Sequence, residues 1–79
     1  MKIEYDKVAN AAYIYVRDKI KDGEVKKSEK LSNDIIFDYD KNNLLLGIEI
    51  LSARKNLAKS ILSSSIKIGN SKKNKKIKI

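Results

Sequence analysis

The spacing of apolar residues changes once along this chain, at Ser52, and that change limits the folds open to it. Before Ser52, short segments rich in strand-favouring residues alternate with turn signals such as Asp22-Gly23. After Ser52, apolar residues recur at helical spacing. Strands followed by a helix are typical of α+β domains. We therefore predict a small antiparallel sheet of four or five strands, followed by one helix and a basic tail.

The predicted strands are expected to occupy different places in the sheet. Residues 11–17 carry apolar side chains at both odd and even positions, which indicates a central strand. Residues 24–31 are mostly charged or polar, and charged side chains protect sheet edges from unwanted pairing, so this segment is predicted to be an edge strand. The predicted strands cover residues 2–5, 11–17, 24–31, 35–40 and 44–51, and the last two give the strongest hairpin signal.

One helix is predicted after Leu51. The Ser52 hydroxyl can accept hydrogen bonds from free backbone N–H groups, so Ser52 is predicted to cap this helix. Three serines at 63–65 end the helix, and residues 66–68 alternate as a short strand does. The predicted domain covers residues 1–68, and residues 69–79 form a basic tail expected to be mobile unless bound. The apolar stripe of the helix consists of Ala53, Leu57, Ala58, Ile61 and Leu62.

The composition removes several ways of stabilising so short a chain. Its 79 residues include neither Cys nor His, which excludes disulfides, thiolate zinc sites and histidine catalysis. A domain this small is marginally stable without such help, so self-association is expected, with a dimer favoured. No apolar run is long enough for a membrane span, and the first five residues do not resemble a signal peptide. We predict a cytoplasmic protein with no cofactor and no membrane partner.

Charge is distributed unevenly along the chain, whose net charge is +8. Residues 1–51 contain nine of the 18 basic residues and all ten acidic ones, whereas residues 52–79 contain nine basic residues and no acid. This asymmetry suggests an acidic partner, because lysine can neutralise phosphates without a defined geometry. A lysine-rich end that only solubilises the chain is the alternative. The candidate nucleic-acid contacts are Lys72, Lys73, Lys75, Lys76 and Lys78.

Five segments occur in the order typical of one known family. They are Lys2-Ile3-Glu4-Tyr5-Asp6, Ala9-Asn10-Ala11-Ala12-Tyr13-Ile14, Ser28-Glu29, Ile36-Phe37-Asp38-Tyr39-Asp40 and Leu46-Gly47-Ile48-Glu49-Ile50-Leu51-Ser52-Ala53. Over approximately residues 2–55 the chain resembles the YuzE-like small proteins, a domain-of-unknown-function family (2283). The resemblance implies a small β-rich domain of prokaryotes and their viruses, with no established activity. The position of some relatives beside toxin-like genes implies a regulatory or antitoxin-like role.

Three groups of side chains are candidates for chemistry, and each has a structural alternative. Asp38, Asp40, Asn42 and Glu49 follow the spacing of a calcium loop. Asn43 stands where such a loop needs glycine, so a hairpin turn is the favoured interpretation. The same carboxylates could form an acid–base pair, although solvated strand positions are favoured. Aromatic residues could form a base-stacking platform, although packing within the sheet is favoured. These aromatic residues are Tyr5, Tyr13, Tyr15, Phe37 and Tyr39.

Together these observations favour a non-enzymatic binding protein, regulatory or antitoxin-like, that associates with itself or with a partner protein. The alternative is an accessory protein that binds nucleic acid non-specifically through its lysine-rich C-terminal tail. No catalytic, cofactor-binding or metal-binding residue is predicted. An enzyme is the least favoured class, because Ser28, Ser32 and Ser52 have no histidine to activate them as nucleophiles.

Overall fold

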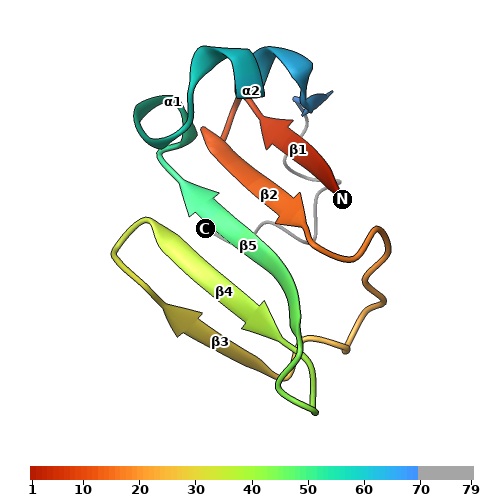
Figure 1. Ribbon diagram of the computed structural model, residues 1–79. Helices are drawn as coiled ribbons and strands as arrows, with labels where there is room; N and C mark the ends of the chain where they lie inside the picture. The colour runs from red at the N-terminus through yellow and green to blue at the C-terminus, as the bar shows by residue number, and fades with distance from the viewer. Residues whose placement is uncertain (70–79) are drawn as a thin grey trace.

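The computed structural model describes residues 1–69, which form a twisted sheet with two short helices at one end (Figure 1). The helices are α1 (Ala53–Asn56) and α2 (Lys59–Ser64). The strands are β1 (Lys2–Asp6), β2 (Ala11–Tyr15), β3 (Lys27–Lys30), β4 (Ile35–Tyr39), β5 (Leu45–Leu51) and β6 (Ile66–Ile68). The prediction of a sheet-rich α+β fold is confirmed, with six strands in the described residues rather than four or five.

The strand order in the sheet is β3-β4-β5-β2-β1-β6. The central position predicted for residues 11–17 and the edge position predicted for residues 24–31 are both confirmed. The sheet is not purely antiparallel, however, because β6 runs parallel to β1. The reason is the helical crossover. β5 and β1 both run antiparallel to β2, and a helical connection that leaves β5 and returns to the far edge places β6 parallel to both.

The single predicted helix is two helices, separated by an extended break. Leu57 has φ −118° and ψ 142°, and Ala58 has φ −61° and ψ 147°. Ala53 and Leu62 of the predicted stripe are buried and Leu57 is partly buried, whereas Ala58 and Ile61 are exposed. Packing against the sheet thus selects three of the five apolar positions, and tertiary contact overrides the helical period.

The start of α1 is fixed by Asn10 and not by Ser52, so the predicted cap is wrong. Ser52 lies in the left-handed region (φ 50°, ψ 54°) and its side chain makes no capping hydrogen bond. The backbone oxygen of Asn10 accepts the N–H of Ala53 at 2.9 Å, and its Oδ1 accepts the N–H of Arg54 at 3.0 Å. Asn10 lies 44 positions before Arg54, a separation that no local capping pattern spans.

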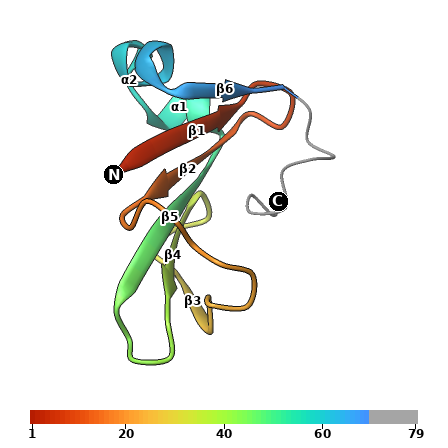
Figure 2. The ribbon, with the colours of Figure 1, turned by 90° about the vertical axis from the view of Figure 1, so that its right-hand side faces the viewer.

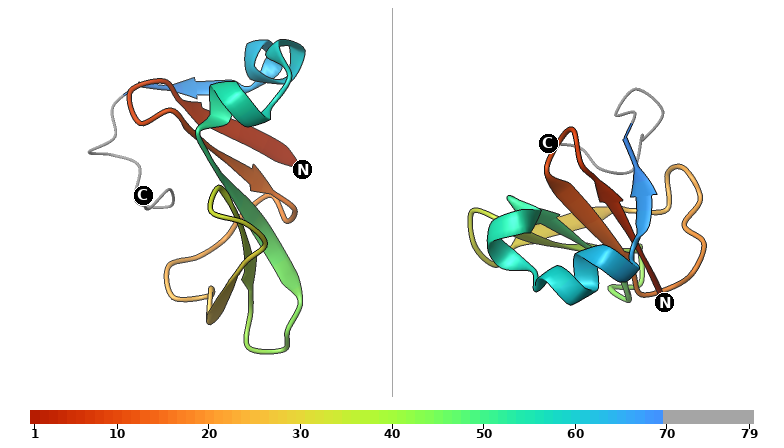
Figure 3. Two further views of the ribbon diagram at one scale, coloured as in Figure 1. Left: turned by 90° about the vertical axis from the view of Figure 1, so that its left-hand side faces the viewer. Right: turned by 90° about the horizontal axis from the view of Figure 1, so that it is seen from above.

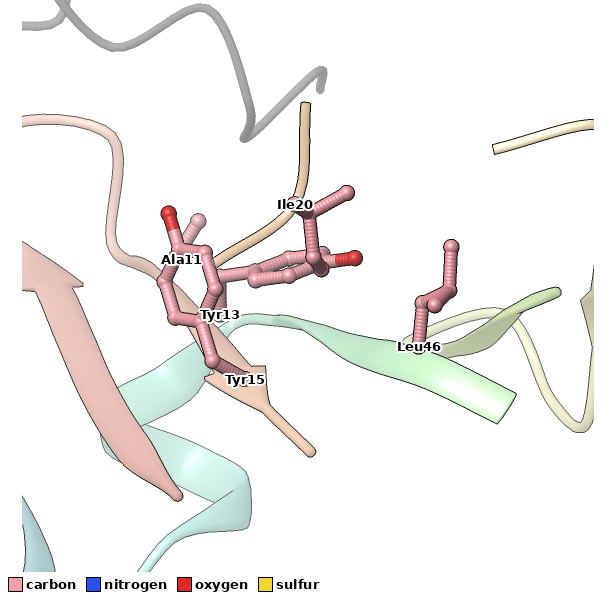
Figure 4. Close-up of a cluster of buried hydrophobic side chains, with 5 residues drawn as sticks. All are labelled: Ala11, Tyr13, Tyr15, Ile20 and Leu46. Atoms are coloured by element: carbon pink, nitrogen blue, oxygen red, sulfur yellow. The ribbon is translucent and has the colours of Figure 1, made fainter. Parts of the chain in front are cut away.

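The two faces of the sheet carry different clusters of buried side chains. The face that the helices cover, here called the helix side, has a cluster of Tyr5, Ala12, Ile50, Ala53 and Leu62. The opposite face, here called the loop side, has a cluster of Ala11, Tyr13, Tyr15, Ile20 and Leu46 (Figure 4). Ile20 belongs to the loop of residues 16–26, which lies on that side of the sheet (Figure 2). Because side chains alternate along β2, its odd-numbered residues belong to the loop-side cluster and Ala12 belongs to the helix-side cluster.

No helix within residues 1–69 is long and apolar enough to cross a membrane. Most of the predicted basic tail, including all five candidate lysines from Lys72 to Lys78, lies outside the described residues.

Candidate functional site

The loop side of the sheet brings four polar side chains together from four strands. In the sheet register, Ser28 lies opposite Asp38, Asp38 lies opposite Gly47, and Tyr13 lies opposite Glu49. Because neighbours in register share a face, all of these side chains project on the loop side. We call Tyr13, Ser28, Asp38 and Glu49 the Asp38 cluster.

Asp38 is the centre of this cluster and is only 3% exposed. Its Oδ2 accepts the hydroxyl of Tyr13 at 2.8 Å, and its Oδ1 accepts the hydroxyl of Ser28 at 2.6 Å. A buried carboxylate is costly unless hydrogen bonds replace the lost water, and bonds to an ionised acceptor are the stronger kind. The two hydroxyls thus stabilise Asp38 and join β2, β3 and β4 across the sheet.

Gly47 makes room for the Tyr13 ring. A Cβ at Gly47 would overlap the hydroxyl and ring carbons of Tyr13. The missing side chain therefore lets the ring cross β5 and reach Asp38 on β4. This accounts for a glycine in the middle of a central strand, where glycine otherwise weakens the sheet.

A second tyrosine–carboxylate pair lies beside the first. Tyr15 donates its hydroxyl to Oε1 of Glu4 at 2.8 Å, and its ring meets that of Tyr13 edge-on, with 4.8 Å between the ring centroids. The ammonium of Lys2 lies 4.7 Å from the centre of the Tyr15 ring. Both rings are thus fixed by polar and aromatic contacts within the sheet.

Burial and nearby carboxylates hold both tyrosines in the protonated form. Burial is the largest cause that raises the pKa of Tyr13, followed by the hydrogen bond to Asp38 and the charges of Asp38 and Glu49. Burial likewise raises the pKa of Tyr15, followed by its hydrogen bond with Glu4. A tyrosine with a raised pKa is a poor base or nucleophile at neutral pH. The arrangement suits hydrogen-bond donation to the carboxylates.

The loop of residues 16–26 has its own anchors. Ile20 packs among the rings of the loop side. Glu24 pairs with Arg17 and accepts the backbone N–H of Lys21 at 2.6 Å. The Lys21 N–H and then Arg17 lower the pKa of Glu24.

The three candidate carboxylates do not meet at one point. Asp38 and Glu49 share the loop side, whereas Oδ1 of Asp40 accepts the backbone N–H groups of Asn42 at 2.8 Å and Leu44 at 3.0 Å. Asp40 thus serves the hairpin turn, as its favoured interpretation requires. Within residues 1–69, no group of three or more acidic, His or Cys side chains is placed to hold a metal ion.

The candidate aromatic platform is divided between the two faces. Tyr13 and Tyr15 lie on the loop side, whereas Tyr5, Phe37 and Tyr39 have helix-side positions in the strand alternation. The five rings therefore do not form one stacking surface, and the platform hypothesis is wrong. The sequence did not indicate that Ser28 contacts Asp38. The only indication is the pairing of β3 with β4, which is visible in the structure alone.

The helix side carries an apolar row that its helices leave partly exposed. The row crosses four strands in register, from Ile3 through Ile14 and Ile48 to Phe37. All four side chains are intermediate in exposure. α1 and α2 lie at the adjacent end of the sheet, above the neighbouring row that contains Ala12 and Ile50 (Figure 3).

The helical end of the molecule exposes basic side chains. Arg54 and Lys55 lie on α1, Lys59 on α2 and Lys67 on β6, and all four are exposed. The Arg54 guanidinium lies 3.2 Å from the Tyr5 hydroxyl. Residues 52–69 contain no acid, so α1, α2 and β6 carry a net positive charge.

Comparison with known families gives one match. The family described as "Protein of unknown function (DUF2283)" matches residues 2–54, the segment that contains β1 to β5 and the whole Asp38 cluster. Comparison with curated proteins and with solved structures finds no significant match. Because the matched segment covers more than half of the chain, this protein belongs to the DUF2283 family, a family of unknown function.

Proposed function

We propose that this chain is a non-enzymatic interaction protein of the cytoplasm, with a regulatory or antitoxin-like role, and that its helix-side face is the contact surface. One observation carries the proposal. The apolar row from Ile3 to Phe37 stays partly exposed in the described residues. A sheet face of this kind is normally buried against another layer.

The Asp38 cluster supports a binding function more than catalysis. Its hydroxyl groups donate to carboxylates within the chain, at 2.6 Å from Ser28 and 2.8 Å from Tyr13. Raised pKa values keep Tyr13 and Tyr15 protonated near neutral pH. These groups stabilise the sheet, whereas the helix-side row is only partly covered within residues 1–69.

Site-specific photo-crosslinking tests the contact surface. A photoreactive phenylalanine analogue in place of Phe37, in cells that normally contain this protein, is expected to give a discrete protein adduct. The matched control carries the same analogue at Ile36, the next residue of β4, whose side chain belongs to the loop side. No adduct at position 37, or equal adducts at both positions, would contradict the proposal.

Nucleic-acid binding through the lysine-rich tail is the second candidate function. The supporting observation is the exposed basic end formed by Arg54, Lys55, Lys59 and Lys67. This end lies on the elements that lead into the tail lysines Lys72 to Lys78. Together they offer a continuous basic stretch of sequence whose lysines bind phosphates without reading bases.

Fluorescence anisotropy with unrelated DNA and RNA oligomers at several salt concentrations tests this second function. Neutralisation of about four phosphates predicts a slope of about −3 to −4 in log K against log salt. A chain that ends at Gly69 keeps β6 and is expected to bind with a flatter slope. Binding that survives this truncation unchanged would exclude the tail mechanism.

A further inference from the structure

The segments around the partly exposed apolar row restrict what can cover it. At one end of the face, α1 and α2 contribute Ala53 and Leu62 to the buried helix-side cluster. Toward the other end, Figures 2 and 3 show no described segment in front of the helix side of β4 and β5. A covering layer must therefore approach over the row of Ile3, Ile14 and Phe37 and avoid the helices.

The helices determine how a second copy of this chain could pack there. Two sheets stack face to face about 10 Å apart with their strands roughly aligned. A two-fold axis along the strands would place the helices of both copies at the same end, where they collide. A two-fold axis across the strands places them at opposite ends. The uncovered parts of the two faces then overlap.

Charges at the β3 margin fit this second arrangement. Lys27 and Glu29 are on the helix side of β3, opposite Tyr39 and Phe37 of β4 in register. The Lys27 ammonium lies 5.1 Å from the centre of the Tyr39 ring. An axis across the strands superposes β3 on β3 in reversed direction. With the axis over Ser28, Lys27 of each copy faces Glu29 of the other, and the two pairs are identical by symmetry.

We propose that a second copy of this chain covers the apolar row, with the two-fold axis across the strands and reciprocal Lys27–Glu29 pairs at the margin. The inference rests on the proposed function, because it names the partner of the same face. Within one chain the Lys27 and Glu29 charges are 3.8 Å apart, and both side chains are about half exposed. Both are therefore available to a second copy.

Light scattering of the full chain from micromolar to millimolar concentration tests the dimer. The wild-type mass is expected to reach twice the chain mass. Phe37→Asp places a charge in the row and is expected to raise the dissociation constant by at least ~30-fold, as loss of an interface hot spot does. Leu44→Asp is the matched control, because Leu44 is 62% exposed and lies in the β4–β5 turn. Circular dichroism checks that each variant folds.

A mixture of two charge variants tests the orientation of the two copies. This test does not require the Phe37→Asp variant to fold. Lys27→Glu gives β3 two acids on the helix side, and Glu29→Lys gives it two bases. Each variant alone repels its own copy across the axis, whereas the two attract each other. Native mass spectrometry of an isotopically labelled mixture is expected to show heterodimers in excess over the statistical half.

Each other outcome overturns the inference in a recognisable way. A monomer at every concentration excludes the dimer. A dimer unaffected by Ile3→Asp and Phe37→Asp places the contact elsewhere, for example edge to edge through β3. A statistical mixture of the charge variants rejects the orientation. If position 37 crosslinks only to a different protein, the proposed function stands and the second copy is rejected.

Discussion

The two faces of this sheet bury their side chains in different ways. On the loop side, tyrosine hydroxyls and carboxylates satisfy one another, and Ile20 from a connecting loop covers the rings. On the helix side, two short helices cover one row of apolar side chains and leave the next partly exposed. The comparison teaches that the polar groups that look most chemical have the structural role. The plain apolar face is the one that we propose as the contact surface.

Removing the acceptor at the centre of the loop side should have the largest effect. Asp38→Ala is expected to lower the free energy of unfolding by about 3 kcal/mol, because the buried Tyr13 hydroxyl and the Ser28 hydroxyl lose their acceptor. Urea unfolding measures the change. Asp40→Ala is the control and should cost about 1 kcal/mol, since its bonds lie in an exposed turn. Equal losses of stability in the two variants would show that the Asp38 cluster contributes no more than the hairpin turn.

A methyl group at Gly47 should have the next largest effect. Gly47→Ala is expected to cost about 2 kcal/mol, because its Cβ overlaps the Tyr13 ring. The cost should fall in a Tyr13→Leu background, where the smaller side chain leaves space. A double-mutant cycle measures this coupling. Additive losses would show that the ring does not explain this glycine.

Alkaline pH should destabilise the protein through the loop side. Tyr13 and Tyr15 have pKa values raised in the folded state above their ordinary value of 10.0, so their contribution is fully present below pH 10 and is lost above it. The free energy of unfolding should fall by about 1.4 kcal/mol per pH unit for each tyrosine. Urea unfolding between pH 9 and pH 11 measures the slope. Tyr13→Phe should make it shallower, and an unchanged slope would argue against this origin.

Calcium should have the smallest effect, namely none on the melting temperature. A ligand that binds only the folded state must raise it, but Asp38 accepts two hydroxyls and Asp40 accepts two backbone N–H groups. Thermal scans with and without millimolar calcium check this expectation. A rise that Asp40→Asn abolishes would make the β4–β5 hairpin a metal site.

The local pattern of the sequence was sufficient for much of the sheet. Strand-favouring residues and turn signals predicted β1 to β5 within a few residues, and charge predicted the edge position of β3. The family resemblance over residues 2–55 agrees with the match to residues 2–54. These features are readable because strand period, turn chemistry and edge charge are properties of neighbouring residues.

Only the tertiary structure decided the site. The contacts of Asp38 with Tyr13 and Ser28 span 25 and 10 positions, and the bond from Arg54 to Asn10 spans 44. Strand order and register create these contacts. Neither strand order nor register can be predicted from single segments, because strand pairing joins segments that are far apart in the sequence. Sequence alone thus determined the strands and the charge asymmetry. The association of strands in space decided which carboxylate is buried, why Gly47 is glycine, and which apolar row stays partly exposed.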